Sequence, residues 1–144
     1  MTGELVKCRP DQDHDDGPCW LADLKSTENA SRDDFMWSAY RYGYHRQAAF
    51  YLDVCAWEGS RRPPDKFFFI AFEKEPPYGY IIYEASLPSL SRGRDAYRAP
   101  LDTYAACRKS GVDGRVFDQV ISSGGLNCAN YQNFHRDVVE GERR

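Results

Sequence analysis

The sequence predicts a mixed α/β domain, and three observations lead to that prediction. Segments in which apolar and polar residues alternate, as in strands, lie on both sides of a middle region with helical periodicity. The segment KFFFIAF at 66–72 is apolar on both strand faces, which is typical of a central strand covered from both sides. A chain of 144 residues can bury one core without disulfides, so we expect one domain.

A hairpin of two strands is expected first. The segment ELVKCR at 4–9 alternates, and CWLADLK at 19–25 alternates again after a short acidic loop at 11–17. The second strand has two different faces: Trp20, Ala22 and Leu24 on one, and Leu21, Asp23 and Lys25 on the other. We expect the first set to face the core and the second to form a wet, charged face.

Two helices are expected next, from about Asp33 to Trp57, with a break at Gly43. Ser, Thr and Asn residues precede them and can cap a helix. The longer helix begins at about Tyr44. It carries a core-facing stripe at three- and four-residue spacing, made of Ala48, Tyr51, Leu52 and Cys55.

The remaining elements are a strand and a helix. YIIYEAS at 80–86 is the strand, and 93–110 is helical in composition, with Pro100 expected to kink or restart the helix. Beyond Gly111 the pattern is too weak to predict an element.

Composition excludes several classes of protein. No stretch approaches the roughly 20 apolar residues that span a bilayer, and no secretory signal pattern opens the chain, so we expect a cytoplasmic protein without a membrane partner. Five cysteines without a CxxC pair favour free thiols over a disulfide framework. Because the net charge is -3, binding to nucleic acid would depend on local basic groups.

The sharpest local pattern is RPD at 9–11 followed by DLK at 23–25. Two carboxylates that converge from adjacent strands, Asp11 and Asp23, repel each other unless a hard divalent cation lies between them. Mg²⁺ or Mn²⁺ suits such oxygen ligands and keeps waters that can become nucleophiles. Lys25 lies on the same strand face as Asp23 and can orient the attacking water or offset phosphate charge. The pattern therefore predicts metal-dependent phosphodiester hydrolysis.

This pattern resembles the PD-(D/E)xK nuclease signature. The strings DLKST, YGYHRQAAFYLD and FFFIAFEKEPPYGYIIYEAS extend the resemblance to the RecE (exonuclease VIII) type of nuclease domain, which is related to RecB-like and lambda-type exonucleases. The resemblance covers about residues 3–111. It implies a restriction-endonuclease-like mixed sheet flanked by helices, with 1–111 as the nuclease-like core and 112–144 as a divergent tail of the same domain.

The resemblance also implies roles for individual residues. The metal ligands would be Asp11, Asp23 and Leu24. Gln47 and Tyr51 match a Gln and a Tyr of the family that lie four apart on one helical face, and would brace the metal site or contact a phosphate; packing is the simpler interpretation of Tyr51 alone. The catalytic residues would be Asp11, Asp23, Lys25, Gln47 and Tyr51.

The activity that the resemblance implies is a 5′-to-3′ exonuclease acting on double-stranded DNA ends in recombination. It further implies a homo-oligomer and, as a candidate partner, a recombination (annealing) protein. The family's upstream helix and strand, which supply a His and a metal-binding Glu, would fall before Met1. We therefore expect a truncated domain that lacks its first helix. The alternative is an inactive remnant that only binds nucleic acid or a partner.

Other interpretations of single residues are weaker. The acidic loop lacks the Gly and Glu of a calcium-binding EF-hand, so Asp13, Asp15 and Asp16 are expected to be solvated. Cys8, His14 and Cys19 match no usual zinc spacing. Several arginines could line a DNA track, although scattered arginines are usually solvated: Arg41, Arg46, Arg61, Arg62, Arg92, Arg94 and Arg98. Three tyrosines could stack on bases, although core packing is favoured: Tyr40, Tyr42 and Tyr44.

Overall fold

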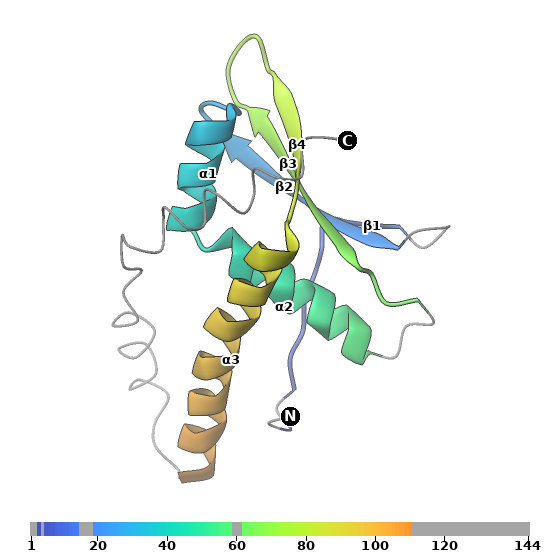
Figure 1. Ribbon diagram of the computed structural model, residues 1–144, viewed down its shortest axis with the longest axis vertical. Helices are drawn as coiled ribbons and strands as arrows, with labels where there is room; N and C mark the ends of the chain where they lie inside the picture. Colours follow the sequence, from blue (N-terminus) through green and yellow to red (C-terminus); the bar gives the residue numbers. More distant parts are fainter. Residues whose placement is uncertain (1–2, 4, 15–18, 59–61, 111–144) are drawn as a thin grey trace.

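The computed structural model describes residues 3, 5–14, 19–58 and 62–110. Four strands form one sheet in the order β1-β2-β3-β4, and three helices gather on one side of it (Figure 1). The predicted mixed α/β architecture is confirmed. Within these residues, no helix combines the length and the apolar character that crossing a membrane requires.

The N-terminal hairpin is confirmed, but its first strand lies later than expected. β1 (Gln12–His14) pairs antiparallel with β2 (Trp20–Thr27), with Gln12 opposite Ala22. The strand predicted at 4–9 is wrong, because 5–10 pairs with no strand. That segment runs beside α2 instead, where the Sγ atoms of Cys8 and Cys55 lie 3.8 Å apart as free thiols. Part of the predicted acidic loop therefore supplies the strand.

The other two strands complete a mixed sheet. β3 (Lys66–Glu73) runs parallel to β2 and antiparallel to β4 (Tyr80–Glu84), which confirms its predicted central position. The prediction that β3 is buried from both sides is wrong. Three of its side chains are buried and the alternate ones are partly or largely open to solvent. The helices cover only one face of the sheet.

The prediction of the core-facing side of β2 was also wrong. Leu21 is buried in the core under the helices, whereas Leu24 is 44% exposed on the opposite face. Asp23 and Lys25 share the face of Leu21 and therefore point toward α2. The alternation of β2 could not decide this, because both of its faces carry apolar residues.

The two middle helices are α1 (Arg32–Arg41) and α2 (Tyr44–Trp57), as predicted. Gly43 separates them with φ of +67°, a conformation that glycine adopts without strain. The predicted stripe of α2 is confirmed: Ala48 and Leu52 are buried, and Tyr51 and Cys55 pack against the core. Phe35 of α1 stacks on Tyr83 of β4 with ring centroids 4.6 Å apart, which fixes α1 on the sheet.

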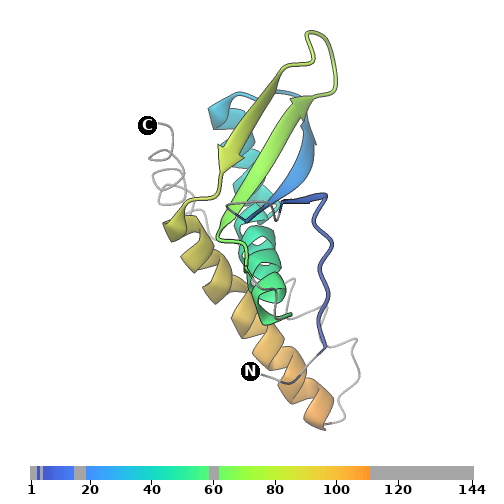
Figure 2. The ribbon, with the colours of Figure 1, turned by 90° about the vertical axis from the view of Figure 1, so that its right-hand side faces the viewer.

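The last helix, α3 (Leu87–Ser110), begins six residues earlier than predicted and runs through Pro100 without a restart. Pro88 lies in its first turn, where a missing N–H costs nothing. α3 crosses α2 and continues past the end of the sheet (Figure 2). At the crossing, a Cβ on Gly93 would lie 2.1 Å from the carbonyl oxygen of His45, so only glycine permits this approach.

Candidate functional site

The site is built around a buried carboxylate on β2. Asp23 is only 4% exposed and forms an ion pair with the ammonium group of Lys25. Gln47 of α2 joins the two residues: its Nε2 donates to Asp23 Oδ1 at 2.8 Å, and its Oε1 accepts from Lys25 Nζ at 2.8 Å. Three of the predicted catalytic residues therefore form one hydrogen-bonded network.

Tyr44 extends this network. The Lys25 ammonium lies over the Tyr44 ring, 4.5 Å from its centroid, a favourable cation–π contact. Burial raises the pKa of the Tyr44 hydroxyl, and the nearby Tyr42 and Asp23 raise it further. From the sequence, Tyr44 was expected only as one of three tyrosines that could stack on bases. Its position one helical turn before Gln47 is what brings it to Lys25.

Asp11 reaches β2 from the edge of the sheet. It lies just before β1 and accepts a hydrogen bond from the backbone N–H of Leu24 at 2.9 Å through Oδ2. In a strand the N–H and C=O of one residue point to the same side, so the Leu24 carbonyl is also directed toward the side of Asp11. The aliphatic side chain of Leu24 cannot bind a cation. If Leu24 is a metal ligand, it must therefore bind through this carbonyl oxygen.

These residues fit the metal that the motif implies. Asp23 Oδ2 is buried and is paired with the Lys25 ammonium group. A buried carboxylate oxygen that already attracts a cationic group is also the type of ligand that a hard cation prefers. Mg²⁺ is usually held by one or two carboxylates plus water and substrate phosphate. Among the described residues, no group of three or more His, Cys, Asp or Glu side chains could hold a metal ion.

Tyr51, the fifth predicted catalytic residue, stands apart from this network. It lies one turn after Gln47 on α2. Its ring meets the ring of Phe67 of β3 edge-on, with centroids 6.2 Å apart. Because it packs against the core, Tyr51 helps to fix α2 against the sheet, and so the position of Gln47.

A pocket of about 510 Å³ opens beside Lys25. Its walls come from the C-terminal end of β2, the loop that follows, α1 and the segment after β3. Arg41, one of the candidate DNA-contacting arginines, and two of the candidate tyrosines, Tyr42 and Tyr44, line it.

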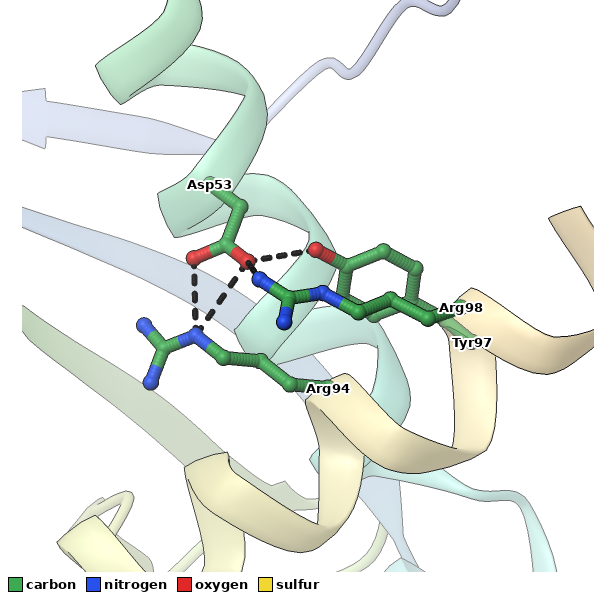
Figure 3. Close-up of polar contacts among 4 residues, drawn as sticks. All are labelled: Asp53, Arg94, Tyr97 and Arg98. Atoms are coloured by element: carbon green, nitrogen blue, oxygen red, sulfur yellow. Dashed lines mark hydrogen bonds and ion pairs between the residues drawn. The ribbon is translucent and has the colours of Figure 1, made fainter. Parts of the chain in front are cut away.

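A second polar cluster was missed in the sequence. Asp53 of α2 is 8% exposed and accepts hydrogen bonds from Arg94 Nε at 2.9 and 3.2 Å and from the Tyr97 hydroxyl (Figure 3). Arg98 adds an ion pair at 3.5 Å. The partners lie about forty residues away on α3, so no local pattern signals them. Arg94 and Arg98 are thus bound to a carboxylate instead of lining a DNA track. Arg61 falls outside the described residues.

The fold and the network together define a PD-(D/E)xK nuclease-like domain of the restriction-endonuclease-like class. A family model described as a PDDEXK-like domain of unknown function (DUF3799) matches residues 1–116, and the chain belongs to that family. A comparison with curated proteins gave no match. The predicted division of the chain at residues 111 and 112 remains a prediction, since residues 112–144 lie outside the described part.

Proposed function

We propose that this domain is a divalent-metal-dependent nuclease that hydrolyses DNA phosphodiester bonds. Its finer activity, in this proposal, is 5′-to-3′ exonuclease action on double-stranded ends in recombination, as in exonuclease VIII. The metal ligands are the carboxylates of Asp11 and Asp23 and the carbonyl of Leu24. The bound ion, Mg²⁺ or Mn²⁺, supplies Lewis acidity toward the phosphate and lowers the pKa of a bound water.

The other residues of the site would then have separate roles. Lys25 carries a positive charge beside the scissile phosphate and donates hydrogen bonds to the attacking water or to a phosphate oxygen. Gln47 is a positioning residue, because it holds Asp23 and Lys25 in register from α2. Tyr51 supports Gln47 through packing. The homo-oligomer and the annealing partner belong to the same proposal and rest on the family resemblance alone.

One observation carries the proposal. Asp23 is buried, its Oδ1 accepts from Gln47, and its Oδ2 is paired with the Lys25 ammonium group. Burying charged groups costs desolvation free energy even when they are paired, and is rarely kept for packing alone. A divalent cation bound at this carboxylate would offset part of that cost.

The test compares wild type with Asp23→Asn, a change of equal size that removes the negative charge. Linear duplex DNA carrying a fluorophore at one 5′ end is incubated with Mg²⁺ or Mn²⁺, and the same ions are titrated by calorimetry. We expect wild type to bind the ion and to release labelled nucleotides from the 5′ end first. Asp23→Asn should lose both ion binding and cleavage. Asp102→Asn, at an exposed position on α3, should retain both.

Two results would contradict the proposal. Cleavage that survives in Asp23→Asn would remove the residue from the reaction. Duplex binding by wild type without ion binding or cleavage would support the alternative, an inactive remnant that serves only as a nucleic-acid or partner-binding module.

A further inference from the structure

The pocket beside Lys25 is lined by aromatic side chains that are partly open to solvent. Trp37 of α1 is 48% exposed and Tyr42, just after α1, is 61% exposed, although both line the pocket. The ring of Tyr42 is stacked with that of Tyr44, with centroids 6.0 Å apart and planes inclined by 22°. Large rings that remain open to solvent around a hollow offer flat apolar faces to a ligand.

Positive charges lie on the same wall. The guanidinium group of Arg41 lies 5.7 Å from the Tyr42 ring centroid, and Lys25 covers Tyr44 in the same way. Lys74, after β3, lines the pocket as well. Rings interleaved with cations form a surface that suits a base and its phosphate.

Two acidic residues, Glu28 and Asp34, also line the pocket. Asp34 Oδ2 already accepts hydrogen bonds from Asn29 Nδ2 at 2.6 Å and Ser31 Oγ at 3.0 Å, and so belongs to the first turn of α1. Glu28 is exposed on the loop. The lining thus holds three cationic and two acidic side chains, and Lys25 is also paired with Asp23.

We infer that this pocket binds one unpaired nucleotide of the DNA strand, with its base against Trp37 and Tyr42 and its phosphate toward Arg41 and Lys25. A paired base inside a duplex has both faces covered by its neighbours and cannot offer one to a ring. A volume of about 510 Å³ suits a small ligand of this size. The inference rests on the proposed nuclease function and adds that the terminal nucleotide of the cleaved strand is unpaired when it enters the pocket.

Binding is tested by fluorescence anisotropy in EDTA, so that no cleavage occurs. The probes are a labelled single-stranded oligothymidylate and a blunt hairpin duplex, with dTMP and inorganic phosphate as competitors. We expect wild type to prefer the single strand and dTMP to compete better than phosphate. Trp37→Ala and Tyr42→Ala should each weaken single-strand binding roughly tenfold, the value of one lost base stack. Trp37→Phe should retain most of the affinity.

Trp57→Ala is the matched control, because Trp57 ends α2 and is 42% exposed, close to the value for Trp37. It should bind like wild type. Equal affinities for Trp37→Ala and Trp57→Ala, competition by phosphate alone, or a preference for the blunt duplex would overturn the inference.

Cleavage assays separate this outcome from failure of the nuclease itself. If wild type cleaves in Mg²⁺ but Trp37→Ala binds and cleaves normally, the nuclease proposal stands and the pocket assignment falls. If single-strand binding depends on Trp37 but no ion supports cleavage, the pocket assignment stands and the nuclease proposal falls.

Discussion

Two buried carboxylates, Asp23 on β2 and Asp53 on α2, differ in the elements that supply their partners. Both are less than a tenth exposed, and both bind at least one cationic side chain. Both oxygens of Asp53 accept hydrogen bonds from α3 (Figure 3), whereas Asp23 accepts from Gln47 through Oδ1 and is paired with the Lys25 ammonium through Oδ2. The charged partners of Asp53 therefore come from a second helix, while the charged partner of Asp23 lies two residues away on the same strand.

The two clusters also connect to different parts of the molecule. Arg94 and Tyr97 connect Asp53 to α3 and so hold two helices together. Lys25 and Gln47 connect Asp23 to a pocket lined by aromatic and basic residues. We therefore expect changes around Asp23 to affect cleavage more than stability, and changes around Asp53 to do the reverse.

The largest effect is expected for Lys25→Gln, because an amide can still donate to Asp23 but carries no charge. Loss of the ammonium should lower the single-turnover cleavage rate about 10²- to 10³-fold at saturating Mg²⁺. Thermal denaturation of the same sample shows whether the variant remains folded. Lys66→Gln is the control, since Lys66 is exposed and pairs with Glu84 at 3.3 Å, away from the Asp23 network. A rate near that of the control would exclude Lys25 from the reaction.

Asp53→Ala should have the opposite profile. It removes the acceptor of Arg94 and of the buried Tyr97 hydroxyl, and should lower the free energy of unfolding by about 3 kcal/mol, because the arginines are partly solvated and lose less than a buried charge would. Urea denaturation measures this loss, with exposed Asp102→Ala expected near zero. Cleavage per folded molecule should stay unchanged; a loss of cleavage with intact stability would place Asp53 in the site.

Gly93→Ala tests the helix contact that carries the Asp53 cluster. A new Cβ would lie 2.1 Å from the His45 carbonyl oxygen and 2.8 Å from Ala49 Cβ, so α3 must move away from α2. We expect a loss of about 1–3 kcal/mol in the free energy of unfolding, despite the better helix propensity of alanine. Ser91→Ala, exposed on the same helix, should be nearly neutral. A stabilised Gly93→Ala would show that the helices are farther apart.

The spacings within the candidate site could be predicted from the sequence, but the Asp53 cluster could not. Asp23 and Lys25 share a face because strands have period two, and Gln47 and Tyr51 align because helices return after four residues. Both relations follow from short spacing alone. The pairing of Asp53 with Arg94 and Tyr97 depends on how two helices cross, which no local spacing encodes.

The choice of sheet face illustrates the same limit. β2 has apolar residues on both faces, so its charged side chains were expected to point into solvent. In the fold they point toward α2, because Gln47 satisfies them there and leaves Leu24 on the open face. The rule that charged side chains face solvent therefore fails for Asp23 and Lys25, and such exceptions are expected at candidate functional sites.

The smallest expected effect concerns His45, a buried ionisable residue where α2 meets α3. Burial, together with the positive charges of the nearby Arg46 and Arg92, lowers its pKa from 6.5 to about 4. The unfolded chain therefore binds an extra proton between these values, so stability is complete above pH 6.5 and is lost as the pH falls toward 4. From pH 7.5 to 5.5 we expect a loss of about 1 kcal/mol in the free energy of unfolding, measured by urea denaturation at each pH. In His45→Gln this share of the pH dependence should disappear, whatever the variant's stability at neutral pH. If both proteins lose stability in parallel, His45 is not held neutral in the fold, and α2 meets α3 through a wetter contact than the buried Asp53 cluster suggests.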